Sequence, residues 1–87
     1  MNLCILIGRI ISDIEFKFII NSKNKSIAEF EIQLLNESIV QIQAYNEMAD
    51  YCYKELNKNG MILMYGKLNE TGKIIIEEVE RVFINTK

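Results

Sequence analysis

Four residues near the middle of the chain have the types and the spacing to bind nucleic-acid bases. They are Ile39, Gln41, Gln43 and Tyr45. Side chains separated by one residue point to the same side of a strand, so these four would share one face. A tyrosine ring gives a base a surface on which to stack, and amides can bond to bases or phosphates. The other interpretation of Tyr45 is a half-buried sheet residue whose hydroxyl reaches water.

Basic residues and a second tyrosine could extend this face. Attraction of phosphates needs only positive charge at loose spacing, so scattered cations are sufficient. The candidates are Arg9, Lys17, Lys58 and Lys67, with Tyr65 as a second ring. Taken singly, each cation is more typical of a solvated surface, and Tyr65 is more typical of a half-buried strand position. Acidic residues mark faces that a nucleic acid must avoid, and they are Glu29, Glu31, Glu77, Glu78 and Glu80.

The composition argues against catalysis, metal binding and a cofactor. The chain has no histidine, and its two cysteines, Cys4 and Cys52, lie far apart without a Cys-x-x-Cys pair. Neither a metal site nor a Cys-His nucleophile can be assembled from these residues. We therefore expect two small buried cysteines, no cofactor, and a protein that is not an enzyme.

Charge and hydropathy restrict the partners of the chain. It carries 10 basic and 12 acidic residues, a net charge of −2, which is not the basic balance typical of nucleic-acid binding. The longest apolar run is too short to span a bilayer, so we expect a soluble, cytoplasmic protein. Hydrophobic residues make up 49% of only 87 residues, which predicts contact of some apolar surface with another subunit. An unusually dense core is the alternative.

One amphipathic helix is predicted over residues 46–58. Its apolar residues fall at i, i+1, i+4, i+5 and i+8 and form a single stripe. They are Met48, Ala49, Cys52, Tyr53 and Leu56. Asn46 is a suitable N-cap, and Asn59-Gly60 supplies a left-handed stop.

Strands are predicted on both sides of this helix. They cover residues 2–10, residues 14–34 with a polar turn at 21–26, and residues 39–45, 61–68 and 73–84. Gly8 predicts a bulge or bend, and the alternation slips near Glu77 and Glu78, which indicates another bulge. Long parallel crossovers are absent, so the sheet should be mainly antiparallel.

This order of elements is typical of the OB-fold. We predict a single domain over residues 1–87 that is all-β with one helix. Its architecture would be a five-stranded, partly open Greek-key barrel with the helix between strands 3 and 4.

Several segments, in order, resemble the bacterial single-stranded DNA-binding proteins that have an OB-fold. The segments are residues 2–10 with Asp13 and Glu15 after them, residues 27–32, residues 45–49 with residues 56–60, and Gly66-Lys67-Leu68. Together they cover nearly the whole chain. The resemblance implies binding of single-stranded DNA without sequence preference, and assembly as a homo-oligomer, either a tetramer or a dimer.

The chain also departs from the family's pattern. Ile14 replaces a usual proline, and Ile39 stands where an aromatic residue, typically tryptophan, precedes Tyr45 by six positions. The connections at residues 36–38 and 69–72 are short, although in the family these loops carry further rings and basic residues. The acidic C-terminal tail is absent after Lys87, so no tail-mediated recruitment of other proteins is expected.

Two functions therefore stay open at this point, and a carbohydrate-binding OB-fold is a third that rests on the small aromatic platform alone. The first is a groove that binds single-stranded DNA by base stacking and phosphate contacts, with Tyr45 as the principal stacking residue. The alternative is an oligomeric protein-interaction module with weak or no DNA binding, which the short loops and the negative charge favour. Salt dependence separates them, because phosphate contacts make affinity fall steeply as salt rises.

Overall fold

The structure is a computed structural model that describes residues 3–20 and 25–82. Within these residues the chain forms six strands and one helix. They are β1 (Leu3–Ile10), β2 (Glu15–Phe18), β3 (Ser26–Leu34), β4 (Ile39–Tyr45), α1 (Glu47–Glu55), β5 (Met61–Leu68) and β6 (Ile74–Val82). The predicted strand ends at Asn2 and Ile84, and residues 21–24 of the predicted turn, lie outside the described residues. No helix in the described part of the chain is long and apolar enough to cross a membrane.

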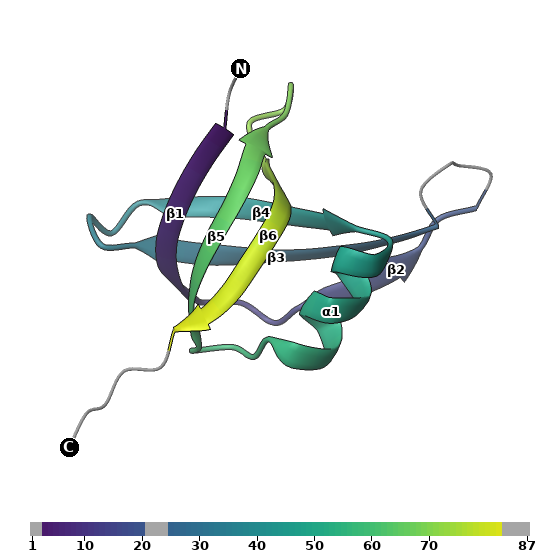
Figure 1. Cartoon of the computed structure of the whole chain (residues 1–87), viewed down its shortest axis with the longest axis horizontal. Coiled ribbons are helices and arrows are strands. Elements are labelled where there is room, and N and C mark those ends of the chain that lie inside the picture. Colours follow the sequence, from purple (N-terminus) through teal and green to yellow (C-terminus); the bar gives the residue numbers. More distant parts are fainter. Residues whose placement is uncertain (1–2, 21–24, 83–87) are drawn as a thin grey trace.

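Five of the strands close into a barrel. The sheet runs β1-β5-β6-β4-β3-β2, and a second pairing of β1 with β3 closes it (Figure 1). All pairings are antiparallel except a short parallel contact between β4 and β6. This confirms the predicted OB-fold. When the edge strand β2 is counted, the helix follows the fourth strand rather than the third; among the five barrel strands it follows the third.

The barrel closes where β1 changes partner. Gly8 lies opposite both Ile62 of β5 and Leu34 of β3. A Cβ atom at this position would lie 2.7 Å from the backbone oxygen of Gln33, which is closer than real side chains approach. Glycine thus allows the two backbones to meet, which is the reason for the predicted interruption of this strand.

The predicted irregularity near Glu77 and Glu78 is a β-bulge. Tyr65 of β5 lies opposite Glu78, whereas the next residue, Gly66, lies opposite Ile76. Glu77 is therefore the extra residue of β6. Gly66 is buried at the same point, and a Cβ atom there would overlap the backbone oxygen of Ile75.

Alternate residues of the strands and one stripe of the helix form the core. The largest fully buried side chains are Ile10, Ile32, Ile42, Ile62, Met64 and Cys52. Burial raises the pKa of the Cys52 thiol to about 12, so the thiol stays protonated and behaves as an apolar group. Cys4 is only half-buried, so the prediction of two buried cysteines holds for Cys52 alone.

The helix α1 packs on one end of the barrel, and three details of its prediction are wrong. Tyr53 of the predicted apolar stripe is 57% exposed, because its ring lies at the rim against Phe16 rather than in the core. Asn46 makes no side-chain cap; its Oδ1 instead accepts a hydrogen bond of 2.7 Å from the backbone amide of Lys25. The left-handed residue after the helix is Asn59, with φ of 77°, and not Gly60.

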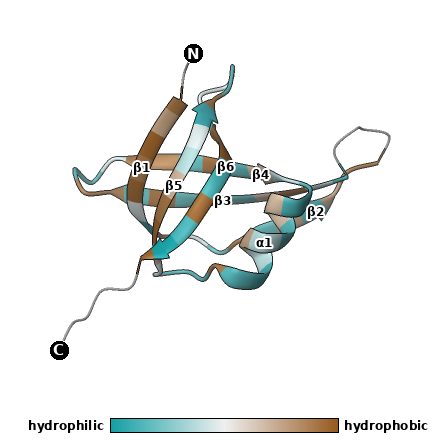
Figure 2. Cartoon of the chain, in the orientation of Figure 1, coloured by the Kyte–Doolittle hydropathy of each residue, from teal (hydrophilic) through white to brown (hydrophobic). Residues whose placement is uncertain are grey.

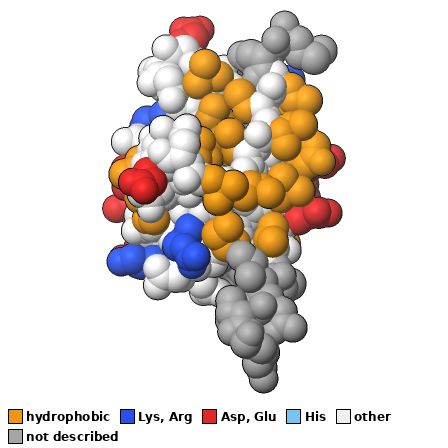
Figure 3. Space-filling view, turned by 90° about the vertical axis from the view of Figure 1, so that its left-hand side faces the viewer, with side chains coloured by type: hydrophobic (Ala, Val, Ile, Leu, Met, Phe, Trp, Pro, Cys, Tyr) orange, Lys and Arg blue, Asp and Glu red, His pale blue; other side chains and the backbone are white. Residues whose placement is uncertain are grey.

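The outer face of β1 is apolar. Leu3, Ile5 and Ile7 alternate with residues that point into the barrel and are 49%, 60% and 41% exposed. Figure 2 shows β1 as hydrophobic along most of its length, and Figure 3 shows hydrophobic side chains gathered in one patch on this side of the molecule. Leu63 and Tyr65 of β5 lie beside Ile7 and Ile5 on the same face.

Gly66→Ala should destabilise the barrel, because the new methyl group would push β5 away from β6 at the bulge. We expect the free energy of unfolding to fall by about 1–3 kcal/mol in urea titrations. Lys67→Ala, at the next and exposed position, is the control and should change it by less than about 0.5 kcal/mol. Equal stability of the two variants would contradict the close approach at Gly66.

Candidate functional site

The outward faces of β2, β3 and β4 form one continuous polar surface. Glu29 lies opposite Gln43 and Glu31 lies opposite Gln41, so two carboxylates of β3 stand beside two amides of β4. A shallow cavity of about 560 Å³ runs over this surface. The polar side chains that line it belong to Ser12, Asp13, Glu15, Glu29, Glu31, Gln41, Lys58 and Lys73. We call this surface the groove face.

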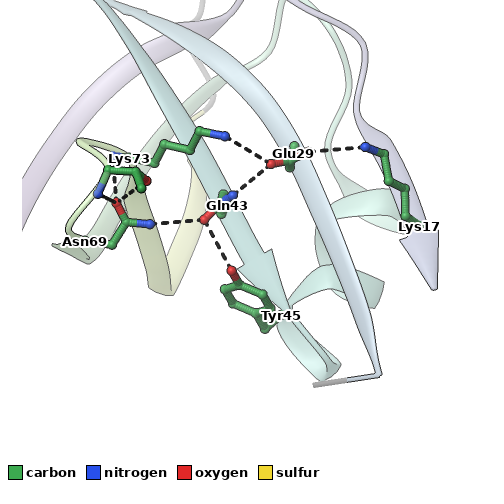
Figure 4. Close-up of polar contacts among 7 residues, drawn as sticks. Lys17, Glu29, Gln43, Tyr45, Asn69 and Lys73 are labelled. Atoms are coloured by element: carbon green, nitrogen blue, oxygen red, sulfur yellow. Dashed lines mark hydrogen bonds and ion pairs between the residues drawn. The ribbon is translucent and has the colours of Figure 1, made fainter. Parts of the chain in front are cut away.

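The amide of Gln43 connects three parts of the groove face (Figure 4). Its Nε2 donates a hydrogen bond of 2.8 Å to Oε2 of Glu29. Its Oε1 accepts hydrogen bonds of 3.3 Å from the hydroxyl of Tyr45 and from Nδ2 of Asn69. Gln43 is 8% exposed, so these bonds satisfy a polar group that has little access to water. The amide thereby holds the Tyr45 side chain against its own strand.

Glu29 is held by two lysines from opposite directions. Its Oε1 lies 3.7 Å from Nζ of Lys17 on β2, and its Oε2 lies 3.5 Å from Nζ of Lys73, which directly precedes β6. The hydrogen bond from Gln43 lowers the pKa of Glu29 most, and the charges of Lys73 and Lys17 lower it further against the opposing effect of burial. Glu29 is therefore a carboxylate at neutral pH.

The hairpin between β5 and β6 positions Lys73. Oδ1 of Asn69 accepts hydrogen bonds from the backbone amides of Thr71 and Lys73 at 2.9 and 3.0 Å. Gly72, with φ of 84°, supplies the left-handed residue that the reversal requires. Because Nδ2 of Asn69 also donates to Gln43, the short hairpin is fixed to the groove face.

The structure brings most of the predicted site residues onto the groove face. Gln41, Gln43 and Tyr45 lie along β4, and Lys17 reaches the face from β2. Lys58 lines the cavity at its far end. Arg9 lies nearby, opposite Gln33, with its Nη1 donating to the backbone oxygen of Asn59 at 2.9 Å.

Tyr65 and Lys67 do not join this group. They lie on the outer face of β5, opposite Ile5 and Leu3 of β1, on another side of the barrel from β4. Nζ of Lys67 lies 3.4 Å from a carboxylate oxygen of Glu77, and Tyr65 is half-buried between β1 and β6. Their position assigns these two residues to the apolar face and not to the groove face.

Sequence reasoning missed three residues of the groove face. It placed Glu29 among the acidic residues to be avoided, and it did not select Asn69 or Lys73. The opposition of Glu29 and Gln43 could have been found from the turn at residues 35–38, which sets the register of β3 against β4. Nothing local in the sequence points to Lys73, because its partner Glu29 lies 44 residues away.

Comparison with known proteins gives relatives by sequence and by structure. No protein-family model matches the chain. A curated relative, "Putative single-stranded DNA-binding protein ycf41" of Pyropia yezoensis, is 31% identical over 86 residues; the match covers 94% of this chain and 75% of that protein.

Solved structures of low sequence identity share the fold. The SSB domain of a Synechococcus protein superposes with a TM-score of 0.79 at 17% identity, with coverage of 91% of this chain and 93% of that one. A mitochondrial single-stranded DNA-binding protein of S. cerevisiae, Rim1, gives 0.81 at 13% identity, with 93% of each chain covered. The single-stranded DNA-binding protein of Thermus aquaticus gives 0.84 at 20%, covering all of this chain and 43% of that one.

The ionisation of Glu29 should make stability depend on pH. A carboxyl group whose pKa is lower in the folded than in the unfolded protein adds to the free energy of unfolding at pH values above its pKa in the unfolded protein. This addition is lost as the pH falls through the pKa in the folded protein. We expect wild type to be more stable than Glu29→Gln at pH 7, and the difference to shrink below about pH 4.5, the ordinary value for glutamate. Urea unfolding of both proteins between pH 3 and pH 7 measures it. A difference that does not change with pH would show that the Glu29 charge adds no stability.

Proposed function

Because the chain belongs to the family of single-stranded DNA-binding proteins, we propose that it binds single-stranded DNA along the groove face. The observation that carries this proposal is the row of Gln41, Gln43 and Tyr45 on β4, with a tyrosine ring held in place by the Gln43 amide. Binding would involve no chemical step.

Each part of the groove face has a role in this proposal. The ring of Tyr45 stacks on a base. This contact does not depend on the DNA sequence, because every base has a flat face. Gln41 is exposed and donates or accepts hydrogen bonds with bases or phosphates. Lys17, Lys58 and Arg9 attract the phosphate backbone as it passes along β2 and the ends of β1 and β5. The absence of a ring at Ile39, which is 57% exposed at the other end of the row, implies few stacked bases per chain.

One observation favours the second candidate, a protein-interaction module with weak DNA binding. Four carboxylates line the cavity, those of Asp13, Glu15, Glu29 and Glu31, beside only two lysines, Lys58 and Lys73. Phosphates would be repelled by such a surface unless its cations are placed close to their path. The two functions differ in their response to salt, which is measured below.

Replacement of Tyr45 by alanine should weaken DNA binding. Loss of one base-aromatic stack costs about 1–3 kcal/mol of binding free energy, which corresponds to an increase in Kd of about 5- to 150-fold. The measurement is a fluorescence-anisotropy titration of labelled oligo-dT at low salt, repeated at rising salt. Tyr53→Ala is the matched control, because Tyr53 is an exposed ring on α1, off the groove face, and its variant should bind as wild type does.

The outcomes of this titration separate the proposals. Absence of wild-type binding at micromolar concentration and low salt would overturn the proposed function. Binding with a flat salt response would favour the protein-interaction module. Equal weakening by Tyr45→Ala and Tyr53→Ala would remove the stacking role of Tyr45.

We also propose that the chain forms a homo-oligomer through the apolar face of β1. Three aliphatic side chains, Leu3, Ile5 and Ile7, are exposed in a row on an ordered strand, and apolar residues of β5 continue the patch. A flat apolar strand face is self-complementary under two-fold symmetry, so a second copy of the chain can cover it with the same residues. A dimer, or a tetramer built from two such dimers, would bury this apolar face. A cytoplasmic location remains a prediction.

Ile5→Lys should break this assembly, because it places a charge at the centre of the apolar face. We expect light scattering coupled to size exclusion to give the mass of a dimer or tetramer for wild type and a smaller mass for the variant. Leu35→Lys, at an 82% exposed position in the turn before β4, should keep the wild-type mass. A monomeric wild type at 100 μM, about the concentration used in such measurements, would contradict the proposal.

A further inference from the structure

Two lysines of the groove face are already bound by one carboxylate of the same chain. Lys17 and Lys73 come from segments far apart in sequence, and both end within 4 Å of the carboxylate oxygens of Glu29, at 3.7 and 3.5 Å. Figure 4 shows the carboxylate between them, next to the strand that carries Gln43 and Tyr45. A phosphate that passes beside Tyr45 would compete with this carboxylate for the same ammonium groups.

The carboxylate cannot easily leave the lysines. Gln43, which is itself 8% exposed, donates a hydrogen bond of 2.8 Å to Oε2 of Glu29. The same amide is fixed by Tyr45 and Asn69, so its orientation is set by two further bonds. The side chain of Glu29 is 27% exposed, whereas those of Lys17 and Lys73 are 62% and 34% exposed. The lysines are therefore the partners that can turn toward DNA, while the negative charge stays in the groove.

We propose that Glu29 is a built-in competitor of DNA phosphate that occupies Lys17 and Lys73 and so sets both the affinity and the salt dependence of the groove. This inference rests on the proposed function. A lysine that leaves Glu29 to pair with a phosphate gains little electrostatic free energy, because it loses one ion pair as it forms another. The carboxylate that it leaves must then be neutralised by a cation from solution. Each occupied lysine thus contributes little to the net release of counterions. DNA binding is therefore weaker and less salt-dependent than the number of lysines alone would give, and the salt dependence that remains comes from Lys58 and Arg9.

Glu29→Gln tests the proposal. Glutamine has the same shape, and its side-chain oxygen can still accept the hydrogen bond from Gln43, so the network around Tyr45 is retained. We expect Kd for oligo-dT at low salt to fall about three- to tenfold, the range of two surface ion pairs. The slope of log K against log salt should steepen by up to about 1.4, or 0.7 for each released lysine on a single strand.

Glu31→Gln is the matched control. Glu31 lies two residues along β3 on the same face and carries the same charge, but within the described residues no lysine or arginine pairs with its carboxylate. Glu31→Gln removes one negative charge that repels phosphate but releases no lysine. It should lower Kd by less than Glu29→Gln does and leave the slope of log K against log salt unchanged. In a protein that also carries Lys17→Met and Lys73→Met, Glu29→Gln should change Kd and the salt slope by no more than Glu31→Gln changes them in the wild-type protein.

The outcomes distinguish this inference from the proposed function. If wild type binds oligo-dT and Glu29→Gln binds no more tightly, or gains no more than Glu31→Gln, the inference is wrong and the proposed function stands. An equal gain from Glu29→Gln with and without the two lysines also overturns it. If no protein of the series binds oligo-dT at low salt, both the proposed function and the inference fail. Thermal unfolding of each variant, followed by circular dichroism, confirms that the comparison is between folded proteins.

Discussion

The position of every surface in this molecule depends on the contact between β1 and β3 at Gly8. The strand β1 pairs with β5 along most of its length and with β3 at its end, and at Gly8 the backbone of Gln33 comes too close for a side chain to fit. Once β1 joins both strands, the barrel closes. The outward face of β3 and β4 then lies on one side of it, and the outward face of β1 and β5 on another. The polar and the apolar surface are separated by this closure.

The groove face is organised by one buried amide rather than by a high positive charge. Gln43 joins a carboxylate of β3, a ring at the end of β4 and the hairpin before β6 through three hydrogen bonds within the protein. A network of this kind fixes the positions of opposite charges with little remaining freedom. Two lysines of the groove face, Lys17 and Lys73, are paired with Glu29 within this network, in a chain whose net charge is −2.

Local patterns are sufficient to predict the architecture, whereas long-range strand pairing decides which side of the barrel each strand face occupies. Alternation identified the strand face that ends at Tyr45 and the bulge near Glu77, because both depend on neighbours in sequence. The same alternation cannot tell which side of the barrel a face occupies, so it does not show that Tyr65 and Lys67 lie beside β1 and apart from β4. From the sequence alone, Glu29 is only an acidic residue that a nucleic acid must avoid, because its two lysines and Gln43 meet it only after the strands pair.

The bulge at Glu77 determines which residues of β6 face the core. Ile74 and Ile76 are buried before it, whereas after it Val79 packs against the core and Glu78 and Glu80 face outward. In a strand with strict alternation, the positions that follow Ile76 on the inner side would be those two glutamates. One inserted residue shifts the phase and sends both charges to water. A homologous chain that is shorter by one residue at this point would therefore keep the same inward set, so gaps in an alignment here need not signal a different barrel.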